Sequence, residues 1–298
     1  MDEKGRPLGI AYLYAMITAA FSIASCLMIF FYSAVDKYAV KAFLLQFCTF
    51  AAIWFIVYVR NRKQNQRFRT IFQDSTVRKA AGALIIITGL TGLSVYLPQI
   101  IYAFSSLVNR NSDLSTVPTI VTVILILFQI AVGLFLLRCK GSACGQYNAG
   151  TVLGIALFYT VLTAAYSLLT KLAQIIFLRN SYNQYFFWWI GCIAAIILVL
   201  YALNKKRHQG LSSVIHDDTA RKSAGILMII NGIVDISVLV NSVVNIIWLL
   251  NSNITSTVYA VSSITLDMIK FIILACQIGL GAYLLKSKRK ADEHNGVR

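Results

Sequence analysis

The sequence predicts an all-α, polytopic membrane protein with eight transmembrane helices, arranged as two parallel four-helix repeats. Three observations lead to this prediction: the composition, eight long apolar stretches, and a basic motif that occurs twice. Apolar residue types make up 58% of the 298 residues and charged types 13%, whereas an ordinary soluble domain has about 25% charged residues. This composition excludes a soluble globular domain, and also a disordered chain, which needs low hydrophobicity.

Eight stretches are long enough to cross a bilayer as helices, which takes about 20 apolar residues. In chain order they cover 9–33, 39–59, 80–105, 115–137, 149–177, 184–203, 223–249 and 257–285. Backbone groups in hydrocarbon must be hydrogen-bonded within the protein, and a helix satisfies them within each span. The strands of a membrane β-barrel have only about 10 residues, so the lengths of these stretches exclude a barrel.

The basic residues predict the orientation of the spans. Most of the 27 Lys and Arg residues lie at the two termini or in the connections that follow even-numbered spans. The other side has only a few, namely Lys37, Lys41, Arg110, Lys171 and Arg179. Because cytoplasmic connections are richer in Lys and Arg, we expect a multi-pass integral membrane protein with both termini in the cytoplasm. The net charge of +16 thus reflects contact with the lipid bilayer, and no nucleic-acid partner is expected.

The first four spans resemble the last four, which indicates an internal duplication. The segment Asp74–Gly82 (DSTVRKAAG) recurs 143 residues later as Asp217–Gly225 (DDTARKSAG). Gln129–Gly133 (QIAVG) recurs 148 residues later as Gln277–Gly281 (QIGLG). Each copy holds an even number of spans, so both copies have the same orientation in the membrane.

The duplication predicts two domains, 1–140 and 141–298, each a four-helix transmembrane repeat. A weaker and finer period divides each repeat into two helical hairpins. Its marker is a glycine that opens every odd-numbered span, namely Gly9, Gly82, Gly150 and Gly225. The chain would then consist of four tandem hairpins.

Each copy of the basic motif lies at the expected start of a span. Asp74 and Asp217, or the threonine two residues after each, are suited to cap a helix N-terminus. The Arg-Lys pair that follows would lie at the level of the lipid headgroups. Two interpretations stay open: the motif is an interfacial anchor, or it docks an anionic lipid or a protein partner on the basic cytoplasmic loops.

Two C-terminal spans carry polar side chains that fall on one face of each helix. The polar residues of this seam are Asn231, Asp235, Asn241 and Asn245 in 223–249, and Asp267, Lys270 and Gln277 in 257–285. In the first repeat, Thr88 and Gly92 take the places of Asn231 and Asp235, and Gln129 takes the place of Gln277. Asp235 lies roughly 20 Å into its span, and a carboxylate at a helix centre costs about 2.5–3.5 kcal/mol.

The polar seam has two interpretations. In the first it holds helices together, with Asp235 or Asp267 paired to Lys270 and with Gln129 and Gln277 hydrogen-bonded between hairpins. In the second it lines a water-accessible cavity or translocation path, because charges in spans usually face a bundle interior or a cavity. Two carboxylates against the single Lys270 would leave one negative charge in excess. That excess favours a cationic or zwitterionic solute.

The function predicted from these features is an integral membrane transporter or channel-like protein that moves a small solute through the polar seam between the repeats. The alternative is a non-catalytic membrane subunit, scaffold or regulator that binds partners through its basic cytoplasmic loops. The spans contain no His or Glu, no nucleophile motif and no cluster of metal ligands, and glycine-rich nucleotide-binding motifs are absent. We therefore expect no enzymatic activity, no metal and no cofactor.

Overall fold

A computed structural model describes residues 6–32, 37–63, 68–108, 116–138, 149–178, 183–206, 217–251 and 257–286, and these residues are almost entirely helical. Eight long helices and one short helix lie within these ranges. The long helices are α1 (Arg6–Tyr32), α2 (Lys37–Lys63), α4 (Ser75–Val108), α5 (Thr116–Arg138), α6 (Ala149–Leu178), α7 (Asn183–Lys206), α9 (Asp218–Asn251) and α10 (Thr257–Lys286). The short helix is α3 (Phe68–Gln73), which the sequence did not predict.

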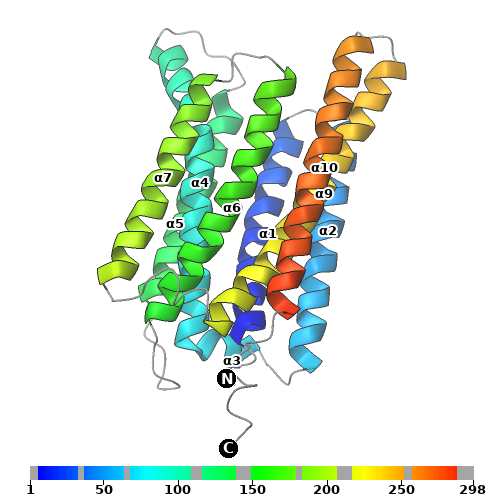
Figure 1. Cartoon of the computed structure of the whole chain (residues 1–298). Coiled ribbons are helices and arrows are strands. Elements are labelled where there is room, and N and C mark those ends of the chain that lie inside the picture. The colour runs from blue at the N-terminus through cyan, green and yellow to red at the C-terminus, as the bar shows by residue number, and fades with distance from the viewer. Residues whose placement is uncertain are drawn as a thin grey trace, which may run out of the picture.

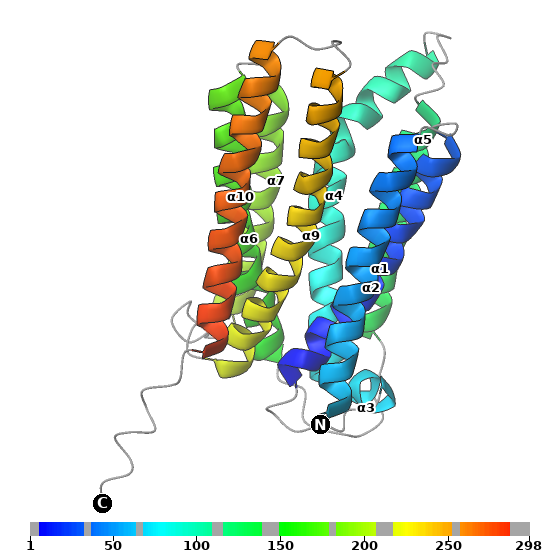
Figure 2. The same cartoon turned by 90° about the vertical axis from the view of Figure 1, so that its right-hand side faces the viewer.

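The long helices run alternately up and down in one bundle, and α1 begins at the same end at which α10 ends (Figure 1). Figure 2 shows the same arrangement from the side, with α3 at that end of the bundle. We call it the α3 end. The first and last described residues both lie at the α3 end because the number of long helices between them is even.

Within the described ranges, five helices are long and apolar enough to cross a membrane. The qualifying segments are Arg6–Ala24, Ser75–Leu93, Ile120–Arg138, Thr151–Ala173 and Ser263–Lys286. Large apolar side chains also cover the outside of the bundle and are about three-fifths exposed, among them Phe55, Ile124, Phe128, Leu198 and Ile272. Exposed large apolar side chains in this number are typical of a surface that lies against lipid or another protein. The all-helical, multi-pass part of the prediction is thereby confirmed.

Four helices, α1, α4, α6 and α9, form the centre of the bundle near the α3 end. Each contributes a fully buried apolar side chain to one core cluster: Ile10, Leu84, Ile155 and Leu227 are all 0% exposed. Alanines that are at most 1% exposed, Ala11, Ala81, Ala156 and Ala224, bring the four helices close together. Apolar packing therefore seals the bundle at this end.

The helix pairs α4–α5 and α9–α10 pack closely through glycines. A Cβ atom on Gly82 would lie 2.8 Å from the carbonyl oxygen of Gly133, and one on Gly225 would lie 2.7 Å from the carbonyl oxygen of Gly281. Small residues permit such close approach of helices in membranes. The two crossings are separated along the chain by 143 residues on the first helix and 148 on the second.

The aspartates of the duplicated motif cap their helices, as the sequence predicts. The Asp74 carboxylate accepts hydrogen bonds from the backbone N–H groups of Thr76 at 2.9 Å and Val77 at 3.2 Å. Asp217 accepts the equivalent bonds from the residues two and three positions later, at 2.9 and 3.3 Å. Because of these caps α4 and α9 begin at Ser75 and Asp218, about one turn before the apolar runs at which the predicted spans begin.

The contacts between the long helices match when α1, α2, α4 and α5 are exchanged with α6, α7, α9 and α10. In this exchange α1 packs on α4 and α9, and α6 packs on α9 and α4. Likewise α2 packs on α9, and α7 packs on α4. Helices from the two ends of the chain therefore interleave, and the central bundle draws on both.

Candidate functional site

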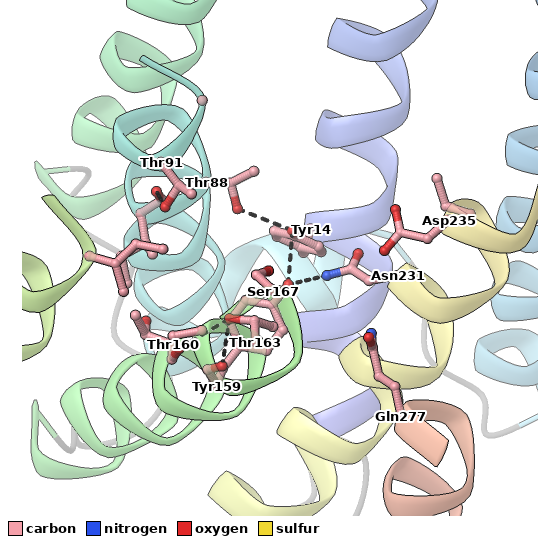
Figure 3. Close-up of a pocket in the computed structure, with 15 residues that line it drawn as sticks. Tyr14, Thr88, Thr91, Tyr159, Thr160, Thr163, Ser167, Asn231, Asp235 and Gln277 are labelled. Atoms are coloured by element: carbon pink, nitrogen blue, oxygen red, sulfur yellow. Dashed lines mark hydrogen bonds between the residues drawn. The ribbon is translucent and has the colours of Figure 1, made fainter. Parts of the chain in front are cut away.

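A cavity of about 360 Å³ lies between the central helices, beyond the apolar core. Residues from α1, α4, α6, α7, α9 and α10 line this central cavity, which Figure 3 shows in close-up. Its polar lining comprises Tyr14, Thr88, Thr91, Tyr159, Thr160, Thr163, Ser167, Asn231, Asp235 and Gln277. Every one of the four core helices contributes a hydrogen-bonding group to it.

A chain of hydrogen bonds crosses the central cavity. The Asn231 side-chain amide donates to the Tyr159 hydroxyl, which lies 3.3 Å from the Tyr14 hydroxyl. The Tyr14 hydroxyl lies 3.1 Å from Thr88 Oγ1. Thr88 Oγ1 donates to the Leu84 carbonyl at 2.9 Å. Each hydroxyl has one hydrogen to give, so Tyr159 donates to Tyr14 and Tyr14 donates to Thr88.

The hydrogen-bond chain is built from equivalent positions of the two halves. Tyr14 and Tyr159, one on α1 and one on α6, meet at its centre. Their outer partners, Thr88 and Asn231, occupy positions that the duplicated motif makes equivalent. The same holds for Gly92 and Asp235, which also line the central cavity.

A second cavity, of about 390 Å³, lies between α6, α9 and α10. This lateral cavity is lined by Tyr166, Ser167, Thr170, Lys171, Asp235, Leu239, Asp267, Lys270, Leu274 and Gln277. Ser167, Asp235 and Gln277 border both this cavity and the central one. A smaller cavity of about 140 Å³ adjoins the central one on the side of α1 and shares Tyr14, Thr88 and Asn231 with it.

Three residues of the predicted polar seam make contacts of their own, one within α10 and one between α10 and α9. Asp267 is buried, and its carboxylate lies 3.2 Å from Lys270 Nζ, as expected for an i,i+3 pair. Gln277 is also buried and donates from its amide to the Met228 carbonyl on α9 at 3.2 Å. That bond lies within the α9–α10 pair.

Asn231 and Asp235 turn toward the cavities. Figure 3 shows both side chains projecting from α9 toward Tyr14 and the central space. Asp235 is an exposed residue, and it borders two cavities that lie between helices. Its carboxylate therefore faces the interior of the bundle.

Three further residues of the predicted seam are not placed in these cavities. Gln129 is half-buried on α5 and is absent from the lining of all three cavities. Asn241 and Asn245 belong to α9, but their side chains lie outside the described ones.

The contribution of α6 is the part of the site that the sequence analysis missed. Four hydroxyl side chains of α6 line the cavities at spacings of three or four residues, namely Thr160, Thr163, Ser167 and Thr170, and Lys171 lines the lateral cavity beside them. The signal for them is present in the sequence. Residues 9–22 (GIAYLYAMITAAFS) match residues 154–167 (GIALFYTVLTAAYS), 145 residues later.

This match pairs three polar positions of α1 with three of α6. Tyr14, Thr18 and Ser22 correspond to Tyr159, Thr163 and Ser167, and all six line one of the cavities. It also places Gly9 opposite Gly154, whereas the sequence analysis placed it opposite Gly150. These six side chains carry hydroxyl groups and no charge, so they do not stand out in an apolar span.

Lys171 changes the charge of the seam. The sequence predicts it among the outer-side charges, but it lies within α6, seven residues before the helix ends, and lines the lateral cavity with Asp235, Asp267 and Lys270. Two carboxylates and two ammonium groups therefore surround this cavity. The expected excess of one negative charge is not present.

The basic residues of the duplicated motif are occupied in contacts of their own. Arg78 is 3% exposed, and its guanidinium donates to the Phe72 carbonyl at 2.9 Å. In the second copy, Arg221 and Lys222 each lie 2.6 Å from the Asp218 carboxylate. Asp74 also binds Arg6 at 3.2 Å, which fastens the start of α1 to the start of α4.

Comparisons with protein-family models, with curated proteins and with solved structures found no match to this chain. Among the residues that the structure describes, no group of three or more His, Cys, Asp or Glu is arranged to hold a metal ion. A functional assignment therefore rests on the cavities and on the symmetry of their lining.

Proposed function

We propose that the protein is an eight-span membrane transporter in which a small polar solute passes through the central and lateral cavities. The observation that carries this proposal is the meeting of Tyr14 and Tyr159, at equivalent positions of the two halves, inside a polar cavity. Buried polar side chains are costly in hydrocarbon and mark solute pathways when they line a cavity.

The eight spans include three long helices besides the five apolar ones. The helices α2, α7 and α9 have 27, 24 and 34 residues, and about 20 suffice to cross the hydrocarbon. They lie in the same bundle and alternate in direction with the other five (Figure 1). Asn231 and Asp235 of α9 line the central cavity.

Two parallel repeats, 1–140 and 141–298, are supported by three kinds of equivalence. The capping aspartates, the glycine crossings and the polar stripes of α1 and α6 recur at nearly constant spacing. The contacts between helices match under exchange of the halves. Parallel repeats are related by an axis along the membrane normal, and their substrate sites lie at the interface of the repeats near the bilayer midplane.

The apolar core at the α3 end closes one side of the proposed path. Ile10, Leu84, Ile155 and Leu227 block passage between the central helices there, while the cavities lie farther along the bundle. With both termini in the cytoplasm, as the basic residues predict, this arrangement is a state closed to the inside. Rocking of one half against the other would exchange it for the opposite state.

The test is solute flux in vesicles that contain the purified full-length protein. Asp235→Asn removes the charge that borders both cavities and keeps the shape of the side chain. We expect it to lower uptake of small cationic and zwitterionic solutes at least tenfold, with an unchanged amount of folded protein. Asp218→Asn, at the exposed start of α9, is the control and should leave uptake unchanged.

Unchanged flux in Asp235→Asn would show that this residue is not part of the path. It would favour the alternative function, a scaffold or regulator that binds partners through basic loops. Charge reversal at Arg221 and Lys222 should then release a co-purifying partner. Arg78 is unsuited to that experiment because it is buried, and its reversal would disturb folding.

A further inference from the structure

Two opposite charges line the lateral cavity without a partner in the part of the chain that the structure describes. Among the described residues, neither Asp235 nor Lys171 forms a hydrogen bond or an ion pair. The other two charges of the cavity, Asp267 and Lys270, pair with each other at 3.2 Å. An unpaired charge within a span is expensive, so two of opposite sign at one cavity indicate a ligand that supplies both missing partners.

The lateral cavity suits a small ligand with a polar and an apolar part. Its volume of about 390 Å³ lies in the range of small-molecule sites, about 300–1,000 Å³. Ser167 and Thr170 add hydroxyl groups beside Lys171 on α6, while Leu239 and Leu274 supply an apolar wall. The cavity also shares Ser167, Asp235 and Gln277 with the central cavity, so the two cavities are neighbours.

Charge selects among the candidate ligands. A purely cationic solute would pair with Asp235 but would leave Lys171 unpaired and would be repelled by it. A purely anionic solute would leave Asp235 unpaired in the same way. Only a ligand that carries both charges satisfies both side chains, and each contact would then be a charge-assisted hydrogen bond.

We propose that the lateral cavity binds a small zwitterion of the α-amino acid class, with its ammonium group at Asp235 and its carboxylate at Lys171. This inference rests on the proposed function, since the bound zwitterion would be the solute that is transported. Lys171 and Asp235 would be the residues that determine specificity.

The test measures binding separately from transport. The purified full-length protein is mixed with each proteinogenic α-amino acid, and the rise in melting temperature reports binding, because a ligand that binds only the folded state stabilises it. For the amino acid that binds best, the amide (which lacks the carboxylate) and the N-acetyl derivative (which lacks the ammonium group) should each bind about 10- to 100-fold more weakly, the loss expected for one charged hydrogen bond.

The variants assign each charge to one residue. Lys171→Gln should abolish the preference for the acid over its amide and keep the preference for the free amine. Asp235→Asn should do the reverse, while Lys171→Arg should keep both preferences. The remote controls Lys206→Gln and Asp218→Asn, which lie outside the cavity, should also keep both. Folding is not expected to suffer, because each neutral variant removes an unpaired charge and should melt no lower than the parent.

Three outcomes decide the matter. If no α-amino acid raises the melting temperature, or if both preferences survive in both neutral variants, the ligand assignment is wrong. If binding follows the expected pattern but no amino acid crosses the vesicle membrane, the ligand assignment stands and the proposed transport fails. If another solute crosses in an Asp235-dependent way and no amino acid binds, transport stands and the ligand assignment fails.

Discussion

The hydroxyl of Tyr159 connects the two halves of the chain. It accepts a hydrogen bond from Asn231 and donates one to Tyr14, which belongs to the other half. Tyr159 is 4% exposed and Tyr14 is 3% exposed. A buried polar group that loses its partner keeps the full cost of its desolvation.

Tyr159→Phe should therefore lower the free energy of unfolding by about 1–3 kcal/mol. The substitution leaves the ring in place and removes only the central link of the hydrogen-bond chain. Thermal unfolding of the purified protein measures the effect. Tyr283→Phe is the matched control, because Tyr283 is 65% exposed on α10 and should tolerate the change. Equal melting temperatures for the two variants would contradict the assigned role of Tyr159.

Residue chemistry also explains which part of the site was foreseen. Asp235 and Asn231 stand out in an apolar span because their burial is expensive, so they could be selected from the sequence. Tyrosine, threonine and serine are ordinary in membrane helices. A threonine or serine hydroxyl can donate to a backbone carbonyl of its own helix, as Thr163 Oγ1 does to the Tyr159 carbonyl at 2.9 Å. Whether such residues line a cavity depends on which helices pack against their own helix.

At the scale of the element, the α4–α5 and α9–α10 pairs pack closely because Gly82, Gly133, Gly225 and Gly281 have no side chain. The Cβ of an alanine at Gly82 or Gly225 would meet a backbone carbonyl oxygen at 2.8 or 2.7 Å. Backbone atoms of a helix cannot turn aside as a flexible side chain can. The two helices of the pair would have to separate.

Gly82→Ala and Gly225→Ala should each destabilise the protein by about 1–3 kcal/mol, the usual cost of overpacking. The control is Gly279→Ala, two residues from Gly281 on α10, where a Cβ would meet nothing within 4 Å. That control should be neutral or stabilising by up to about 1 kcal/mol, because alanine favours a helix over glycine. Denaturation curves of the three variants measure these changes in the free energy of unfolding. A loss in Gly279→Ala as large as that in Gly225→Ala would show that close packing is not the cause.

The ends of the elements were partly predictable. Local hydrogen bonds at Asp74 and Asp217 follow from the motif itself, because a cap involves only residues within a few positions. The short helix α3 was not predicted, since six residues between two apolar runs carry no clear periodic pattern. Its contacts with α1 and α4 stabilise it where its sequence alone is uninformative.

For the whole molecule, the eight-span proposal makes the two ends of one helix differ in accessibility. In a variant without native cysteines, Lys206→Cys and Lys286→Cys should react with a membrane-impermeant thiol reagent only after cells are opened. Asn183→Cys, at the other end of α7 from Lys206, should react in intact cells. Mass labelling on a gel reads the result. Reaction of Asn183→Cys and Lys206→Cys from the same side would contradict a membrane-crossing α7.

The sequence by itself determined the helical class, the apolar exterior, the capped starts of α4 and α9 and the costly groups of α9 and α10. These features depend on local composition, on helical periodicity and on hydrogen bonds between near neighbours. Only the tertiary structure decided that α6 and α1 meet at Tyr159 and Tyr14, that Lys171 joins Asp235 at one cavity, and that Gln277 bonds α10 to α9. Each of these facts depends on which helices are neighbours, and the interleaving of the two halves sets that through side-chain packing between residues far apart in the chain.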